Sequence, residues 1–96
     1  MPAVIVAPTA QADLERLIQS HSLPRSTRER LRRSIDPLRD FPLLGAELHG
    51  RWAQFRFILG PWRWMIVVYY YDPDADLVAV ATIQDGRSAA AVAAAR

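Results

Sequence analysis

The stretch WAQFRFILGPWRWMIVVYYYDPDADLVAVATIQDGR, residues 52–87, decides the fold of this chain. It contains three apolar runs separated by two turn signals, Gly60-Pro61 and the segment DPDAD at 72–76. The runs are rich in aromatic and β-branched residues, which favour strands. The stretch therefore predicts three consecutive antiparallel strands over 52–59, 62–71 and 77–84.

Strand alternation sorts the side chains of the first two runs onto two faces. If Gly60 and Pro61 are the loop residues of a hairpin, Leu59 lies opposite Trp62. This register places three polar side chains, Gln54, Arg56 and Arg63, on one face. The other face then carries Phe55, Phe57, Trp62, Trp64 and Ile66. We therefore expect an apolar face that forms the core and an open face that carries guanidinium groups.

The second turn gives Arg63 a potential partner. If 72–76 is the loop, Tyr71 pairs with Leu77, and Arg63 falls opposite Asp85. This would form an ion pair at the rim of the open face. From the pattern alone, both a structural and a functional role for Arg63 remain open.

The N-terminal half predicts one strand followed by two helices. Residues 3–7 form a β-branched run that Pro8 ends, and Thr9 is a candidate cap for a helix that reaches Ser20. Ser26-x-x-Glu29 is a capping-box pattern, and Pro37 ends the second helix near residue 36. We therefore predict a single α+β domain, residues 1–96, with the order βααβββ. A helical hairpin would cover one face of a small, mostly antiparallel sheet.

Composition narrows the classes of function. The chain has 96 residues, a net charge of +2 and no cysteine, which excludes disulfides and thiolate metal sites. Its two histidines, His21 and His49, lack the neighbours of a triad or a metal site, so we predict surface histidines, no metal and no cofactor. No apolar run is long enough for a membrane span and no leader is visible, so we expect a cytoplasmic protein.

Taken in order, the segments resemble the RelE/ParE superfamily of type II toxins. The resemblance rests on APTAQADLERL, on SLPRSTRERLRRSIDPLRDFPLLGAELHG, on the FRF strand, on WRWMIVVYYYD and on IQDGRS. It covers nearly the whole chain. It implies a small, basic, cytoplasmic growth inhibitor that a cognate antitoxin holds inactive by wrapping the toxin with its C-terminal segment.

The resemblance implies one of two targets. RelE-like members cleave mRNA on the ribosome without a metal, using basic residues of the sheet, whereas ParE-like members inhibit DNA gyrase. Arg56, Arg63 and Arg87 match basic positions of the superfamily, and they would be catalytic only in a RelE-like protein. Gln54 stands where the nucleases usually carry a basic residue. The tyrosine expected soon after Arg87 is missing from SAAAVAAA at 88–95, which favours the ParE-like target.

Three alternatives therefore stay open: a gyrase inhibitor, an mRNA endoribonuclease, and a degenerate toxin that only binds its antitoxin. Trp52, Gln54 and Asp85 are the expected binding residues. We expect the antitoxin to cross the open face or to pack beside the helices, burying Trp52 and contacting Arg56 or Arg63. Arg63→Ala should abolish toxicity without unfolding the protein, and Phe57→Ala and Trp64→Ala should destabilise it.

Overall fold

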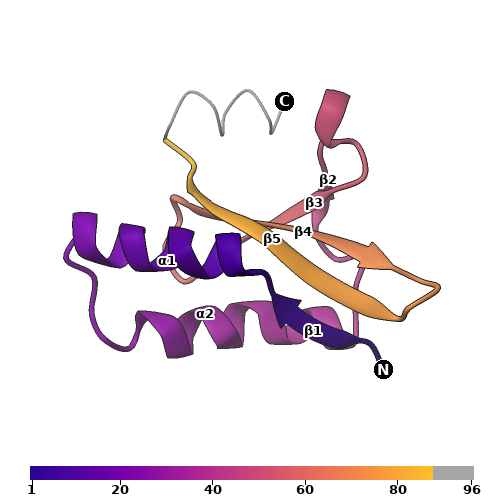
Figure 1. The fold of residues 1–96 in the computed structure, drawn as a ribbon, viewed down its shortest axis with the longest axis horizontal. Helices are drawn as coiled ribbons and strands as arrows, with labels where there is room; N and C mark the ends of the chain where they lie inside the picture. The colour runs from indigo at the N-terminus through magenta and orange to yellow at the C-terminus, as the bar shows by residue number, and fades with distance from the viewer. Residues whose placement is uncertain (88–96) are drawn as a thin grey trace.

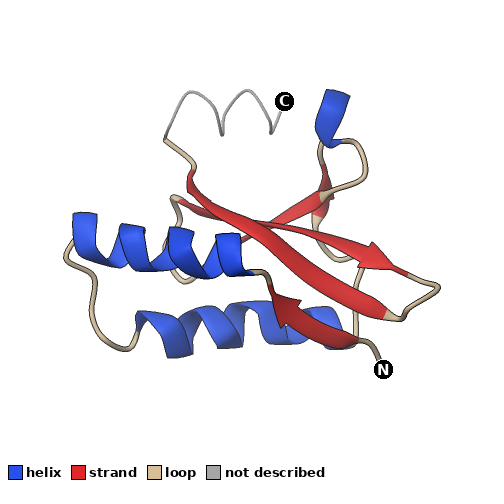
Figure 2. Cartoon of the chain, viewed as in Figure 1, coloured by secondary structure: helices blue, strands red, loops and turns tan. Residues whose placement is uncertain are grey.

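A computed structural model of the chain describes residues 1–87 and shows two helices packed on a five-stranded mixed sheet (Figures 1 and 2). The elements are β1 (Ala3–Val6), α1 (Pro8–Ser20), α2 (Thr27–Ile35), the 3₁₀ helix η1 (Asp36–Arg39), β2 (Ala46–Glu47), the 3₁₀ helix η2 (Gly50–Trp52), β3 (Arg56–Leu59), β4 (Met65–Asp72) and β5 (Leu77–Asp85). The sheet order is β1-β5-β4-β3-β2. Among the strand pairs of residues 1–87, β1–β5 alone is parallel. The predicted α+β fold is confirmed, with the short strand β2 added between η1 and β3.

The helix boundaries follow the prolines more closely than the predicted caps. Proline suits the first turn of a helix, and α1 begins at Pro8 with Ala7 as its N-cap, so the prediction of a Thr9 cap is wrong. Ser26 precedes α2 but makes no side-chain capping bond. The chain leaves α-helical geometry at Ile35 and continues as η1, which contains Pro37. The second helix therefore ends where the missing proline N–H predicts.

The main core lies between the helices and the sheet. Met65, Val67 and Tyr69 of β4 are fully buried there. The cluster also contains Ala10, Leu14 and Leu17 of α1, Leu31 and Ile35 of α2, Leu38 of η1, and Val78, Val80 and Ile83 of β5. These helical residues are spaced three or four apart, as one face of a helix requires.

The predicted assignment of the sheet faces is wrong. Arg56 pairs with Tyr69 and Ile58 pairs with Val67, so both lie on the helix-covered side. Phe57 pairs with Val68 and lies on the opposite side. The reversal arises because the helices cover the face that carries Met65, Val67 and Tyr69 of β4. Trp62 and Trp64 also pack against this core, but they do so from the connection that precedes the strand.

The β3–β4 connection is also longer than the predicted two-residue loop. The Gly60 N–H donates to the Met65 carbonyl, and the Met65 N–H donates to the Trp62 carbonyl. Arg63 and Trp64 therefore belong to the connection and not to a strand. As a result, Arg63 does not share a sheet face with Arg56, and Asp85 pairs with Met65 rather than with Arg63.

The side of the sheet opposite the helices is partly covered by the chain itself. Leu48, Val68 and Ala79 are buried but lie outside the helix-side cluster. The Phe55 ring meets Tyr70 edge-on at 5.7 Å, and the Trp52 ring meets Phe55 at 5.3 Å. The segment that includes η2 therefore packs against this side, which the sequence analysis expected to be open. Within residues 1–87, no helix has the length and apolarity to cross a membrane.

Candidate functional site

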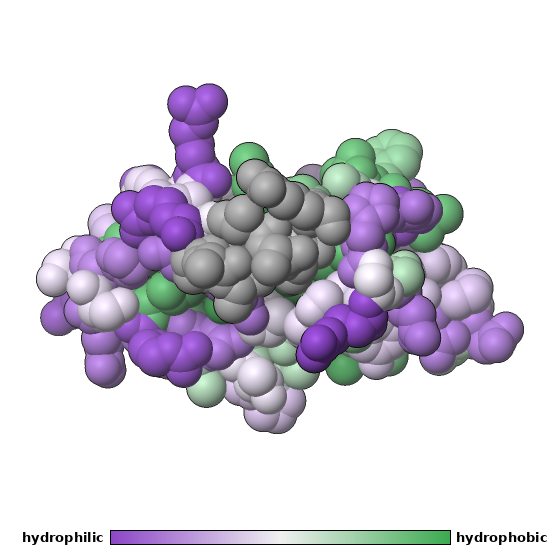
Figure 3. All heavy atoms as spheres, turned by 90° about the horizontal axis from the view of Figure 1, so that it is seen from above, coloured by the Kyte–Doolittle hydropathy of each residue, from purple (hydrophilic) through white to green (hydrophobic). Residues whose placement is uncertain are grey.

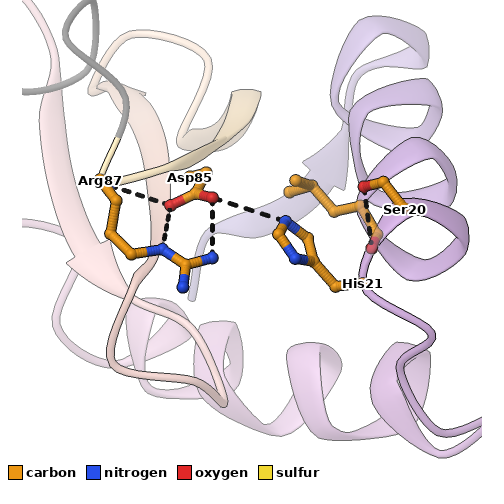
Figure 4. A network of polar contacts seen from close by, with 5 residues as sticks. Ser20, His21, Asp85 and Arg87 are labelled. Atoms are coloured by element: carbon orange, nitrogen blue, oxygen red, sulfur yellow. Dashed lines mark hydrogen bonds and ion pairs between the residues drawn. The ribbon is translucent and has the colours of Figure 1, made fainter.

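Arg87, Asp85 and His21 form a polar cluster at the end of β5 (Figure 4). The Arg87 side chain donates from Nε to Asp85 Oδ1 and from Nη2 to Asp85 Oδ2, both at 2.9 Å. The Arg87 backbone N–H donates to Oδ1 at 2.9 Å. His21 Nε2 lies 3.5 Å from Asp85 Oδ2. The Asp85 carboxylate therefore links His21, which follows α1, to Arg87, which follows β5.

Trp64 provides an aromatic surface for the same cluster. The His21 and Trp64 ring centroids are 4.6 Å apart, and Arg87 Cζ lies 4.7 Å from the Trp64 ring centroid. The guanidinium is thus positioned both by a bidentate carboxylate and by a cation–π contact. Arg87 and Asp85 were named from the sequence. His21 is exposed and Trp64 packs against the core, both as predicted, but their contacts with Asp85 and Arg87 were not predicted. No spacing in the sequence brings His21 and Trp64 together, because only the tertiary fold does so.

The electrostatics of the cluster follow from these contacts. The hydrogen bonds from the side chain and then the backbone of Arg87, with a smaller contribution from the charge of His21, lower the pKa of Asp85 to about 2. The hydrogen bond to Asp85 raises the pKa of Arg87 in turn. Because each group stabilises the charged form of the other, the pair stays ionised but is nearly neutral as a unit.

The Arg56 guanidinium is bound to neighbouring groups of the protein itself. Its Nη1 donates to the Gly45 carbonyl at 2.9 Å and to the Leu43 carbonyl at 3.3 Å. Its Nη2 lies 3.0 Å from Glu47 Oε1, and its side chain is 23% exposed. The guanidinium therefore fastens the segment before β2 to the sheet, and its charge is already matched by Glu47.

Tyr69 reinforces this attachment from the core. Its hydroxyl accepts a hydrogen bond from the Gly45 N–H at 2.8 Å and donates to the Pro42 carbonyl at 2.9 Å. Burial raises the pKa of Tyr69, against the lowering effects of the Gly45 hydrogen bond and of the Arg56 charge. A Cβ at position 45 would lie 2.6 Å from the Phe57 carbonyl oxygen, so the chain can approach the sheet here only with glycine.

The remaining predicted site residues lie apart from one another. Arg63 is exposed and makes no hydrogen bond or ion pair with the residues that the structure describes, so the expected Arg63–Asp85 pair is absent from this part of the chain. Gln54 is exposed in the turn before β3, and Trp52 is half-buried in η2.

The three candidate arginines do not converge on one point. Asp85, which holds Arg87, pairs with Met65, whereas Arg56 pairs with Tyr69. Four residues of strand separate these two positions along β4, or about 13 Å. The structure therefore brings Arg87 together with Asp85 but leaves Arg56 at a separate place. Within residues 1–87, no group of three His, Cys, Asp or Glu side chains is arranged to hold a metal ion.

A groove between the two helices is a second feature of the surface. It encloses about 470 Å³, with Leu14, Leu31 and Ile35 among its apolar lining residues. Charged side chains lie beside them, including Glu15, Arg28 and Arg32. Arg28 donates from Nε and Nη2 to the two carboxylate oxygens of Glu15 at 2.6 and 2.5 Å, which links the helices across the groove.

The Asp85 cluster makes stability depend on pH. Because the pKa of Asp85 is about 2 in the folded protein and near 3.8 when unpaired, its contribution is fully present above about pH 4. We expect this contribution to disappear as the pH falls through 2. Chemical denaturation between pH 6 and 2 should therefore show a steeper loss of unfolding free energy in the wild type than in Asp85→Asn. Equal pH slopes in the two proteins would show that the carboxylate is not stabilised as described.

Comparisons with known proteins identify the family. Residues 4–90 match the sequence model of the ParE toxin of the type II toxin-antitoxin system, parDE. The chain belongs to this family of toxins. No curated protein sequence matches it closely enough to be counted as a relative.

Solved structures with the same fold include the following two. The toxin-antitoxin complex RelBE2 from Mycobacterium tuberculosis contains a chain with 22% identity and a TM-score of 0.64, and the match covers 88% of this chain and 99% of that one. A conserved hypothetical protein from Helicobacter pylori has 20% identity and a TM-score of 0.56, with 86% of this chain and 92% of that chain covered. At this level of identity, the two structures establish the architecture only.

Proposed function

We propose that this toxin arrests growth by binding DNA gyrase, and that it does not cleave RNA. The observation that carries the proposal is the neutralisation of two of the three candidate arginines. Arg87 is held by both oxygens of Asp85, and Arg56 is held by Glu47 and two carbonyls. A nuclease of the RelE type needs such cations to be free to bind phosphate.

The chemistry of RNA cleavage supports the same choice. Attack by a 2′-hydroxyl requires one group to take a proton, one to give a proton, and cations that stabilise the charged phosphorane. Arginine is a poor proton shuttle because it stays protonated. His21 lies near Arg87, but its Nε2 faces Asp85, and the nearly neutral Asp85–Arg87 pair offers no net positive charge that would attract a phosphate. The arrangement therefore fits a protein ligand better than a phosphodiester substrate.

We further propose that the cognate antitoxin binds along the groove between α1 and α2. The groove offers an apolar floor and charged edges, which suits the apolar face of an amphipathic helix. This selects the position beside the helices from the two that the sequence analysis left open. The interface would then not require Trp52, whose ring contacts Phe55. The working location of the toxin is the cytoplasm, where gyrase acts.

Induced expression without antitoxin, followed by pulse labelling, tests the proposed target. We expect DNA synthesis to fall first and DNA-damage responses to rise, while amino-acid incorporation initially continues. Arg63→Ala is a second variant for the same assay, and we expect it to abolish toxicity, as predicted from the sequence. Because Arg63 is exposed and unpaired within residues 1–87, the substitution should leave the melting temperature near that of the wild type.

Two outcomes would count against the proposal. An immediate stop in amino-acid incorporation, with cuts in mRNA, would favour the RelE-like alternative. Normal growth at high expression of the folded protein would favour a degenerate toxin that only binds its antitoxin.

A further inference from the structure

Large apolar side chains gather on the surface loop between η1 and β2. Phe41, Leu43 and Leu44 are 63%, 59% and 58% exposed. Leu59 of β3 is 52% exposed, and the pairing of Ala46 with Phe57, continued by two residue pairs, places it opposite Leu44. We define these four residues as the loop patch. Figure 3 shows hydrophobic atoms, in green, between purple hydrophilic ones toward the end of the molecule where η2 lies.

The backbone beneath the loop patch is fastened from inside. Tyr69 bonds the Gly45 N–H and the Pro42 carbonyl, and Arg56 bonds the Leu43 and Gly45 carbonyls. The loop's inward polar groups are thus satisfied by side chains of the sheet. The apolar side chains are exposed because the loop is held in this conformation. A surface fixed before binding loses little conformational entropy when a partner docks.

The charge around the loop patch selects the class of partner. Residues 41–46, FPLLGA, carry no charge, and the exposed carboxylates of Asp40 and Glu47 flank them. Arg39 is paired with Asp36, and the Arg56 guanidinium is turned to the inner side of the loop. Glu47 is itself paired with Arg56, so in the part of the chain that the structure describes, residues 39–47 offer one unpaired carboxylate, Asp40, and no unpaired cation. Such a surface disfavours nucleic acid, whose phosphates need nearby cations. It suits an apolar region of a protein surface.

The size of the loop patch argues against a second copy of this chain as the partner. Four side chains that each expose on the order of 100 Å² give roughly 400 Å², the size of a typical largest apolar patch, which is often functional. Obligate homodimers bury roughly 1,000–2,500 Å² on each partner, whereas transient contacts bury less than about 600 Å² on each. The patch is therefore better suited to serve as an apolar anchor within a wider contact.

We propose that the toxin binds its protein target through the loop patch, and that the loop patch docks on an uncharged apolar region of that target. The inference rests on the proposed function, since a toxin that acts by binding needs such a surface. The separate groove between α1 and α2 remains available to the antitoxin. The toxin would therefore bind its target and its antitoxin with two different surfaces.

The double variant Phe41→Ser, Leu44→Ser tests the inference, with Ile5→Ser as the matched control. Ile5 is 48% exposed on β1, at the opposite edge of the sheet. We expect the double variant to melt near the wild-type temperature and to bind antitoxin within about two-fold of the wild type. We expect growth arrest to require at least about ten-fold more protein, as for the loss of a binding hot spot. The control should arrest growth as the wild type does.

A single variant, Leu43→Arg, keeps the test valid if the double variant fails to fold. It adds a charge at an exposed position, so it should disturb the loop patch without disturbing the fold. Full toxicity of both folded variants would overturn the inference. A loss of antitoxin affinity with unchanged toxicity would assign the loop patch to the antitoxin instead and would also overturn it. If toxicity depends on the patch but purified gyrase is unaffected by the wild type, the docking surface stands and only gyrase as the target is wrong.

Discussion

Tyr69→Ala is expected to unfold the protein or to bring it close to unfolding. Tyr69 is fully buried at the centre of the sheet, and truncating a buried aromatic side chain costs about 3–5 kcal/mol. The variant also leaves the Gly45 N–H and the Pro42 carbonyl without their partner. Since a small domain has about 5–15 kcal/mol of stability in total, little would remain. Chemical denaturation followed by circular dichroism measures the loss.

Two further variants separate the ring of Tyr69 from its hydroxyl and from the sheet face. Tyr69→Phe keeps the ring and loses both hydrogen bonds, so we expect the unfolding free energy to fall by about 1–3 kcal/mol. The structural change should be largely confined to the loop before β2, which these bonds hold. Phe57→Ala truncates an aromatic residue on the opposite, partly exposed side and should cost less than Tyr69→Ala. If Phe57→Ala is the more damaging of the two, the helices cover the other face of the sheet.

Asp13→Ala should be the second most damaging change. Asp13 lies in α1 with only 7% of its surface exposed. Its Oδ2 accepts hydrogen bonds from the Thr82 hydroxyl and from the Ile83 N–H at 3.2 Å, and its Oδ1 accepts from Arg16. These bonds lie where β5 carries an extra residue, Ala81, because Val68 pairs with Thr82 but Tyr69 pairs with Val80. The carboxylate therefore satisfies backbone and side-chain groups that the irregular strand leaves unpaired.

The expected cost of Asp13→Ala is about 2–6 kcal/mol, because two donors, one buried and one part-buried, each lose their acceptor at about 1–3 kcal/mol. Burial raises the pKa of Asp13, but the hydrogen bonds from Thr82, Arg16 and Ile83 outweigh burial and lower it overall. Its contribution is thus present above the unfolded carboxyl pKa and is lost as the pH falls through the folded value.

Asp13→Asn provides the matched control for this pH dependence. It keeps a carbonyl acceptor but has no acid titration at this position, so its stability should change less with pH than that of the wild type. Denaturation curves at pH 7 and pH 3 measure the difference. A variant Asp13→Ala that is as stable as the wild type at pH 7 would contradict the bonding of α1 to the irregular part of β5.

The order of elements could be predicted because local signals specify it. Pro8, Pro37 and Gly60-Pro61 mark the ends of elements, and both helices cover one face of the sheet as predicted. The registers could not be predicted in the same way. The β3–β4 connection includes Trp62 and Trp64, a residue type that is also common in strands. The extra residue in β5 cannot be recognised, because the sequence of this strand is mostly apolar on both sides of it. Each misplaced pair changes which side chains meet.

The candidate site was predictable only where residues are close in sequence. Asp85 and Arg87 are two positions apart, and both were named, although Asp85 was expected to pair with Arg63. His21 and Trp64 join them only through the tertiary fold. Arg56 was expected on an open face, yet it binds the loop before β2. The loop patch of Phe41, Leu43, Leu44 and Leu59 was missed because an apolar loop and an apolar core segment look alike in sequence.

The central claim, that this toxin acts by binding gyrase rather than by cutting RNA, is tested most directly with two parallel reactions. Purified toxin, released from its antitoxin, is added to gyrase with relaxed plasmid and to a ribosome-containing translation reaction with labelled mRNA. We expect that supercoiling stops or that cleaved DNA accumulates, while the mRNA stays intact, and that added antitoxin restores supercoiling. Cut mRNA on the ribosome, with supercoiling unchanged at the same toxin concentration, would contradict the central claim.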